Sequence, residues 1–184
     1  MIIDRDKERD IAALIRKDKG SATKEIYSAY AGYVAGICAR YLSSDDDIKD
    51  VAQDSFVKIF ISVGSFRYSG AGSLTGWIGR LTVNCALNYL RDNNRLRFAT
   101  SPFEIPDIAD DPPDVEGLSA DDLASLIREL PDGYRTVFNL YAIEGKKHKE
   151  IAKLLGIKEN SSASQYLRAK ALLAMKIKEY LNSK

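Results

Sequence analysis

Two groups of polar side chains in this chain are spaced so that each would line one side of a helix. The first group contains only arginine and asparagine, at steps of four, four, three and four residues: Arg80, Asn84, Asn88, Arg91 and Arg95. Residues at such steps stack along one helix face. Because no acidic residue belongs to it, the group favours contact with phosphates and base edges, and a solvated polar face is the other interpretation. From this segment alone both stay open.

The second group follows a helix-turn-helix pattern, in which HKEIAKLLGI precedes KENSSASQYLRAKALL. Ala152 is small where two helices would approach each other, and Gly156 can adopt the positive φ of the turn. The second helix of such a motif enters the DNA major groove with its first turns against base edges. The expected base contacts are Ser161, Ser162, Ser164, Gln165 and Arg168, and the expected phosphate contacts are Lys146, Lys147, Lys149 and Lys170.

The pattern departs from the usual motif at Ser162. An apolar residue is usual there, because this position docks the second helix on the first. We expect the Ser162 hydroxyl to bond a backbone carbonyl instead, at some cost in stability. The motif as a whole favours double-stranded DNA as the partner, and a helical protein–protein module is the alternative.

The sequence predicts no catalytic residue, metal site or cofactor. The single histidine, His148, begins a lysine-rich segment without a clustered carboxylate or serine, so we expect a capping or surface role. The run Asp45 to Asp47 is explained by negative charge at a helix N-terminus. Cys38 and Cys85 each fall within an apolar stripe, which predicts reduced, buried thiols.

Helical periodicity runs through both flanks of the chain, and no long segment alternates as a strand would. The expected helices cover residues 26–42, 45–64, 74–97, 118–130, 134–143, 148–155 and 161–181. Ser44 is a suitable N-cap for the second of these, and Gly64 is expected to end it. The predicted fold class is therefore all-α.

Charge and proline divide the 184 residues into three parts. The net charge is +3 over residues 1–100, −9 over 101–133 and +7 over 134–184, for a total of +1. All five prolines lie between residues 102 and 131. Acidic, proline-rich segments favour extended paths. We therefore expect two small helical domains, 1–100 and 118–184, joined by a flexible, acidic, proline-rich linker at 101–117.

No apolar run reaches the ~18 residues that suggest a membrane span. The N-terminal stretch MIIDRDKERD is too charged for a secretory signal. We therefore expect a cytoplasmic protein that does not insert into a membrane.

Two sets of residues, in this order, resemble the extracytoplasmic-function (ECF) sigma factors of bacterial RNA polymerase. The first half resembles sigma region 2 in the string DVAQDSF from Asp50 to Phe56, followed by Phe66, Trp77 and Asn84. The second half resembles region 4 in LPDGYRTVFNLYAIEGKKHKEIAKLLGI followed by SASQYLRAKALL. The resemblance covers nearly the whole chain apart from the linker.

The resemblance implies two roles for the first half. Region 2 would dock on core RNA polymerase through Asp50, Gln53, Asp54 and Phe56. It would also melt the promoter minus-ten element and capture single-stranded bases, which need stacking surfaces and pockets. The implied minus-ten contacts are Phe66, Arg67, Tyr68 and Trp77, with Arg80, Asn84, Asn88, Arg91 and Arg95 along the strand.

Region 4 would read the minus-35 element as duplex through the helix-turn-helix residues named above. An anti-sigma factor is a further implied partner. The linker would thread into the polymerase, where its carboxylates imitate nucleic acid, or serve only as a tether. The expected function is an alternative sigma factor that binds core polymerase, selects promoters and helps open DNA without catalysing a reaction. The alternatives are a helix-turn-helix activator that works with another sigma factor and a protein-binding helical adaptor.

Overall fold

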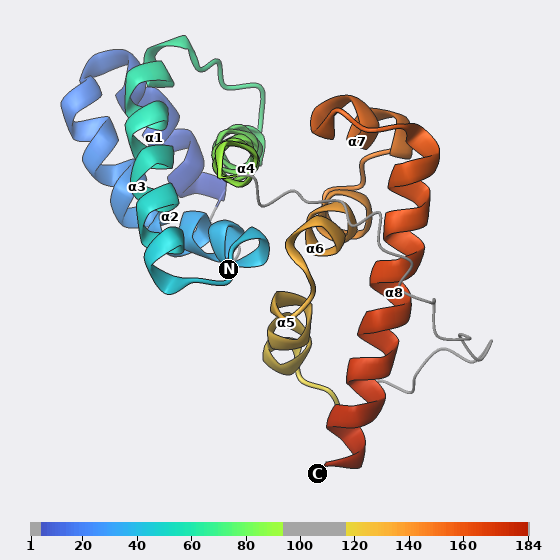
Figure 1. Cartoon of the computed structure of the whole chain (residues 1–184). Coiled ribbons are helices and arrows are strands. Elements are labelled where there is room, and N and C mark those ends of the chain that lie inside the picture. The colour runs from blue at the N-terminus through green and yellow to red at the C-terminus, as the bar shows by residue number, and fades with distance from the viewer. Residues whose placement is uncertain (1–4, 94–116, 184) are drawn as a thin grey trace. The chain divides into compact units, whose positions relative to one another are not determined.

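The computed structural model describes residues 5–93 and 117–183, and every regular element in these ranges is helical (Figure 1). The chain separates into two compact units, Met1–Tyr89 and Leu90–Lys184. The all-α class with two helical domains is thus confirmed. The predicted linker at 101–117 lies outside the described residues except for Gly117.

Unit 1 contains four α-helices and one short 3-10 turn. The elements are α1 (Arg5–Lys17), α2 (Lys19–Tyr41), α3 (Asp45–Ser62), η1 (Val63–Ser65) and α4 (Ser73–Asp92), whose last residues extend past the unit boundary at Tyr89. Helix α2 packs against α1 and against α3. Most of the apolar residues whose spacing predicted the helix at 26–42 are buried, including Ile26, Val34 and Ile37, whereas Tyr27 is exposed. Cys38 and Cys85 are free and buried in the same unit, as expected.

The structure adds helix α1 and the first turns of α2, which the sequence analysis did not predict. Ile11 and Ile15 of α1 are buried at a spacing of four residues, but this stripe is short. The start of α2 carries Gly20 and Ser21, which are weak helix formers. The side chain of Asp18 compensates, because it caps α2 by accepting from the Gly20 N–H at 2.9 Å.

Helix α3 begins as its sequence predicts. The Ser44 hydroxyl accepts from the backbone N–H of Asp47, and three aspartates occupy the first turn. The helix ends at Ser62 and passes into the 3-10 turn that contains Gly64, rather than ending at Gly64 itself.

Unit 2 is built along its last helix, shown in red in Figure 1. Its elements are α5 (Ala120–Arg128), α6 (Asp132–Phe138), the π-helical turn η2 (Asn139–Ile143), α7 (His148–Leu155) and α8 (Glu159–Asn182). Helices α5, α6 and α7 each pack against α8. The core joins Leu126, Leu130 and Tyr134 to Ala169 and Leu173 of α8.

The turn between α7 and α8 has the predicted helix-turn-helix geometry. Gly156 adopts a left-handed conformation with φ 69°, which favours glycine. The Ile157 N–H then donates to the Ala152 carbonyl at 3.0 Å, and Ile151 and Ala152 are buried beneath the turn. This turn sets the angle at which α8 leaves α7.

Within residues 5–93 and 117–183, no helix is both long enough and apolar enough to cross a membrane.

Candidate functional site

An acidic and amide face runs along the outside of α3. Asp50, Gln53 and Asp54 are all exposed on this helix. The first turn of the helix is tied to α4, because the Tyr89 hydroxyl donates to the Asp47 carboxylate at 2.6 Å. The three predicted polar residues are therefore available to a partner.

Phe56 is placed differently from the sequence expectation and does not belong to that exposed face. Its side chain is 7% exposed, and its ring lies 4.8 Å from the ring of Tyr27 and 5.7 Å from that of Phe60. A partner cannot contact a ring that α2 and α3 already cover. Phe56 packs these helices together, and the correction follows from its position on the buried stripe with Val51 and Ile59.

Two apolar residues that the sequence analysis missed continue the exposed face of α3. Val57 and Ile61 follow Asp50 and Asp54 at steps of three and four residues, which keeps them on the same side. Ile61 is 80% exposed, a large value for an isoleucine. The signal was present in the sequence, because neither residue fits the buried stripe of the helix.

An open hollow lies beside this face, on the surface shared by α2 and α3. Its lining comprises Thr23, Lys24, Tyr27 and Phe60. Tyr27 is more than half exposed even though its ring contacts Phe56. The exposed face of α3 is therefore acidic toward its start and apolar toward its end, next to an aromatic hollow.

The segment between η1 and α4 carries the residues predicted to hold a base. Phe66 is buried against Trp77, with ring centroids 5.4 Å apart, which leaves little of its ring for stacking on a nucleotide. Arg67 is exposed and donates to the carbonyls of Gly64 and Phe66. Tyr68 is half-buried. Phe66 and Trp77 pack on each other, so Tyr68 is the predicted aromatic residue in this segment whose ring is not part of that pair.

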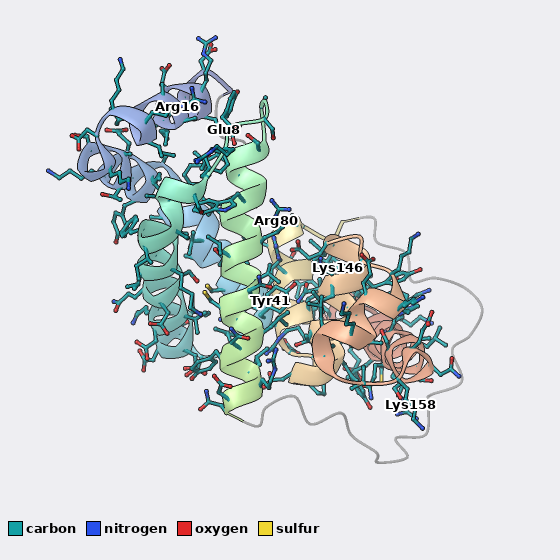
Figure 2. The ribbon with its side chains drawn as sticks, turned by 90° about the horizontal axis from the view of Figure 1, so that it is seen from above. Glu8, Arg16, Tyr41, Arg80, Lys146 and Lys158 are labelled. Atoms are coloured by element: carbon teal, nitrogen blue, oxygen red, sulfur yellow. The ribbon has the colours of Figure 1, made fainter. Side chains whose placement is uncertain are left out.

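Helix α1 contributes a residue to this segment that the sequence analysis missed. The Glu8 carboxylate accepts a hydrogen bond from the Gly72 N–H and another from the Thr75 N–H, the latter at 2.7 Å. Figure 2 shows Glu8 beside the first turn of α4. No local pattern signals this contact, because the partners are more than 60 residues apart in sequence.

The arginine and asparagine group lies on the exposed side of α4. Arg80, Asn84, Asn88 and Arg91 are exposed, and Figure 2 shows Arg80 projecting from the helix. On the opposite side of the helix, Ile78, Cys85 and Ala86 are buried, so the helix has one core side and one cationic and amide side. Arg95 lies outside the described residues.

The helix-turn-helix of unit 2 exposes only part of its predicted contact set. Ser164 and Lys170 of α8 and Lys149 of α7 are exposed, and Ser161 and Arg168 of α8 are half-buried. Lys146 before α7 is half-buried and Lys147 is exposed. Lys158, which precedes α8 and is labelled with Lys146 in Figure 2, adds an exposed cation that was not predicted.

Ser162 is fully buried and is not available to a base. Its hydroxyl lies 3.0 Å from Nδ1 of His148, so its partner is a side chain of the preceding helix and not a backbone carbonyl. His148 is half-buried and bonds Ser162 of α8, and the N-cap of its own helix is Lys147. His148 holds α7 to α8 where an apolar contact is usual.

Gln165 is also buried, at 5% exposure, so its predicted base contact does not agree with its placement. Its Oε1 atom finds no hydrogen-bond partner in the described part of the chain, and the same holds for Nε of Arg168. A buried acceptor without a partner costs stability. Of the residues predicted to contact bases, Ser161, Ser164 and Arg168 remain accessible.

An aromatic cluster fixes the junction of α7 and α8. The ring of Tyr141 stacks on His148 with centroids 4.4 Å apart and an interplanar angle of 11°, and it lies 4.4 Å from the ring of Tyr166. Phe138 stacks on the far side of Tyr166 at 6.0 Å. Burial raises the pKa of the Tyr166 hydroxyl.

Two family models match the chain. The model described as Sigma-70 region 2 matches residues 26–96, and the model described as Sigma-70, region 4 matches residues 115–173. The region 2 match contains the exposed faces of α3 and α4, and the region 4 match contains the helix-turn-helix.

Curated relatives agree with these matches. The chain is 31% identical to the ECF RNA polymerase sigma-E factor of Haemophilus influenzae over 83% of this chain and 85% of the relative. It is 27% identical to the ECF RNA polymerase sigma factor SigE of Mycolicibacterium smegmatis over 81% of this chain and 59% of the relative. A solved structure of CnrH in complex with the cytosolic domain of CnrY is similar at 23% identity, with 94% of this chain and 98% of that chain covered and a TM-score of 0.49.

The chain therefore belongs to the ECF sigma factors of the sigma-70 family. It is an alternative sigma factor, a protein that directs RNA polymerase to promoters and takes part in transcription initiation.

Proposed function

We propose that the two exposed faces of unit 1 divide the work of promoter opening. The face of α3 formed by Asp50, Gln53, Asp54, Val57 and Ile61 binds core RNA polymerase. The face of α4 formed by Arg80, Asn84, Asn88 and Arg91 guides the single strand of the minus-ten element. The observation that carries the proposal is the separation of these faces by charge: one is acidic and apolar, and the other has cationic and amide side chains without a carboxylate.

The composition of the α3 face suits a protein partner. Exposed apolar side chains that adjoin charged ones are typical of interfaces, where apolar contact gives affinity and charge gives orientation. Carboxylates here favour a basic surface on the polymerase. Phe56 supports the face from below, by its contacts with Tyr27 and Phe60.

The α4 face suits a nucleic-acid strand. Arginine contacts phosphates and stacks on bases, and asparagine can donate to and accept from base edges. Arg67 and Tyr68, in the segment that leads into α4, offer a cation and a partly exposed ring for an unstacked base. Arg95 and Trp77 complete the proposed strand path, with Trp77 acting through its packing on Phe66.

Unit 2 would bind the minus-35 element as duplex. Ser161, Ser164 and Arg168 read base edges from the first turns of α8, and Lys149, Lys158 and Lys170 hold phosphates. Ser162 and Gln165, which are buried, keep α8 in place. A second partner, an anti-sigma factor, and a cytoplasmic location are expected from the family. The protein itself would catalyse no reaction.

Reconstituted transcription tests the function. Purified core RNA polymerase and this protein should initiate from a promoter of the gene that encodes it, without any other sigma factor. A requirement for an added housekeeping sigma factor would favour the activator instead. Transcription that survives Arg91→Ala and Arg168→Ala together would favour a protein-binding adaptor.

The α3 face is tested by charge reversal at its exposed positions. Asp54→Lys should weaken binding to core polymerase at least tenfold, because a carboxylate facing a basic surface becomes a like charge. Asp10→Lys, the same charge reversal at an exposed carboxylate of α1, is the control. Equal core affinity for Asp54→Lys and the wild type would contradict the assignment of this face.

A further inference from the structure

Helix α4 begins without a side-chain cap of its own. The Gly72 carbonyl accepts the first helical hydrogen bond, from the Gly76 N–H at 2.8 Å, so Gly72 occupies the N-cap position. Glycine has no side chain with which to satisfy the first free N–H groups of the helix. Three residues on, Thr75 occupies the position from which a glutamate usually reaches back to the cap.

Glu8 of α1 supplies both missing contacts. One of its carboxylate oxygens accepts from the Gly72 N–H and the other accepts from the Thr75 N–H at 2.7 Å. These are the two N–H groups that a local capping box satisfies with two side chains. A single residue from another helix, 64 positions before Gly72, does the same work here.

The surroundings of Glu8 make this contact specific. Glu8 is only 2% exposed and forms no ion pair within the described part of the chain. Burying a carboxylate is costly unless hydrogen bonds and local positive charge compensate. The two N–H groups and the positive end of the α4 dipole supply that compensation. The Tyr30 hydroxyl lies 3.2 Å from Oγ1 of Thr75 and ties the same turn to α2.

This contact fixes one end of the segment that leads into α4. At the other end, Phe66 is held by its packing on Trp77 and by its N–H bond to the Val63 carbonyl. Between them Gly70 and Gly72 take φ values of +123° and +83°, which are accessible chiefly to glycine. Without Glu8, those glycines would leave the backbone of this end with many alternative conformations.

We infer that Glu8 is a positioning residue for minus-ten capture, which it serves by clamping the start of α4 and so setting the placement of Arg67 and Tyr68. The inference rests on the proposed role of that segment and of the α4 face. Glu8 precedes the residues that the region 2 model matches, 26–96, so the family match assigns it no role. In this way a carboxylate that does not contact DNA affects the affinity of the segment for the captured minus-ten base.

The test uses the full chain bound to core polymerase. Glu8→Gln has nearly the same volume but no charge, and it turns one acceptor into an amide that cannot accept from an N–H. Glu25→Gln, exposed on α2, is the matched control. Three quantities are measured: affinity for core polymerase, affinity for minus-35 duplex, and the rate of promoter opening from a fluorescent base analogue in the minus-ten element.

We expect Glu8→Gln to slow promoter opening about tenfold and to reduce discrimination among minus-ten base variants. Core and duplex affinities should stay within about twofold of the wild type, and Glu25→Gln should match the wild type in all three. Amide hydrogen exchange should show faster exchange at Thr75 in Glu8→Gln. Unchanged opening would overturn the inference, and so would equal losses of core binding and opening, which would indicate general unfolding.

Arg91→Ala and Tyr68→Ala separate this inference from the proposed function on which it rests. If both variants open the promoter normally, the segment and the α4 face are not the minus-ten site, and the proposed function fails. If both variants slow opening while Glu8→Gln does not, the proposed function stands and the role of Glu8 is refuted.

Discussion

At the scale of the residue, burial decides which polar side chains of unit 2 can reach DNA. Ser161, Ser164 and Arg168 stand on the accessible side of α8, whereas Ser162 turns toward His148. A rotation of about 100° separates neighbouring residues on a helix. One position along the chain is therefore enough to move a hydroxyl from the accessible side of α8 into the helix junction.

Arg168 should act as a base reader. Arg168→Ala should cost about 1 to 3 kcal/mol at one minus-35 base pair, because a bidentate arginine–guanine contact is lost. Binding to a set of single-base promoter variants measures this. Lys170→Ala is the comparison: it should weaken all variants alike and lower the salt slope by about one. A uniform loss for Arg168→Ala would make Arg168 a phosphate contact.

Gln165 should act as a core residue despite its polar type. Gln165→Met has a similar length and removes the buried Oε1 atom that has no described partner. Removing an unsatisfied buried acceptor should raise the free energy of unfolding by about 1 kcal/mol and leave promoter preference unchanged. Chemical denaturation and the same promoter set provide the readouts. A changed preference at a single base pair would show instead that Gln165 turns outward to read DNA.

Cys38 should be unreactive in the folded protein. Burial raises the pKa of its thiol from 9.0 to about 12, so only about one molecule in ten thousand is thiolate at pH 8. Alkylation followed by peptide mass spectrometry should detect Cys38 only after unfolding. The raised pKa also means that the stability this thiol contributes is complete below pH 9 and is lost as the pH rises from 9 to 12. Rapid labelling of native Cys38 at pH 8 would contradict the predicted lack of reactivity.

At the scale of the element, close approach of helices constrains single positions. Helix α2 comes near α4 at Gly79, where an added Cβ would lie 2.7 Å from the Tyr33 hydroxyl oxygen. The helix propensity of alanine favours replacement of a helical glycine by about 1 kcal/mol, while steric overlap opposes it. The sign of the net effect therefore depends on the neighbouring helix.

Gly79→Ala should destabilise unit 1 by about 1 kcal/mol, because the overlap exceeds the gain in propensity. Gly36→Ala, in α2 with no heavy atom within 4 Å of the added Cβ, should stabilise it by a similar amount. In a Tyr33→Phe background, which removes the overlapping oxygen, Gly79→Ala should become stabilising. Thermal unfolding measures all three. Stabilisation by Gly79→Ala in the wild-type background would rule out the close approach.

Arg135 closes the turn between α5 and α6. Its fully buried guanidinium donates to the carbonyls of Arg128 and Leu130 and forms an ion pair with Asp132. Lysine cannot reproduce this arrangement, because its ammonium lacks the planar fork of donors. Both Arg135→Ala and Arg135→Lys should destabilise unit 2, the first by about 3 kcal/mol. Lys153→Ala, at an exposed site on α7, is the control.

At the scale of the whole molecule, each of the two compact units has its own core, and tryptophan fluorescence reports on one of them. Trp77, the single tryptophan, lies in unit 1, whereas the mutated residue Arg135 lies in unit 2. Arg135→Ala should therefore lower the midpoint of part of the helical signal in circular dichroism and leave the Trp77 fluorescence transition in place. A shift of the Trp77 transition by the same amount would mean that the two units unfold as one.

The charge pattern also acts at this scale. The net charge of +1 is the sum of a −9 segment and two positively charged parts that flank it, so the net charge alone says little about partners. Two hypotheses remain for the acidic segment at 101–133: competition for cationic polymerase surfaces, or service only as a tether. Replacing the aspartates before residue 118 with asparagines and measuring promoter escape distinguishes the two roles; these aspartates are Asp107, Asp110, Asp111 and Asp114.

The sequence by itself determined the helical class, the division into two helical parts and the helix-turn-helix. Periodicity, caps and the positive φ that Gly156 requires are local properties of the chain, and they were sufficient for α3 to α8. The exposed face of α4 followed from spacing for the same reason. The family motifs, which are also contiguous in sequence, pointed to the function.

Only the tertiary structure decided which residues of each face are accessible. Periodicity places a side chain relative to its own helix axis, but burial depends on where a second helix crosses it. That crossing covers Phe56, Ser162 and Gln165, and it leaves Val57 and Ile61 exposed. The contact between Glu8 and the start of α4 joins residues 64 positions apart. Its donors are backbone N–H groups, which every non-proline residue carries, so no residue pattern in the sequence predicts it.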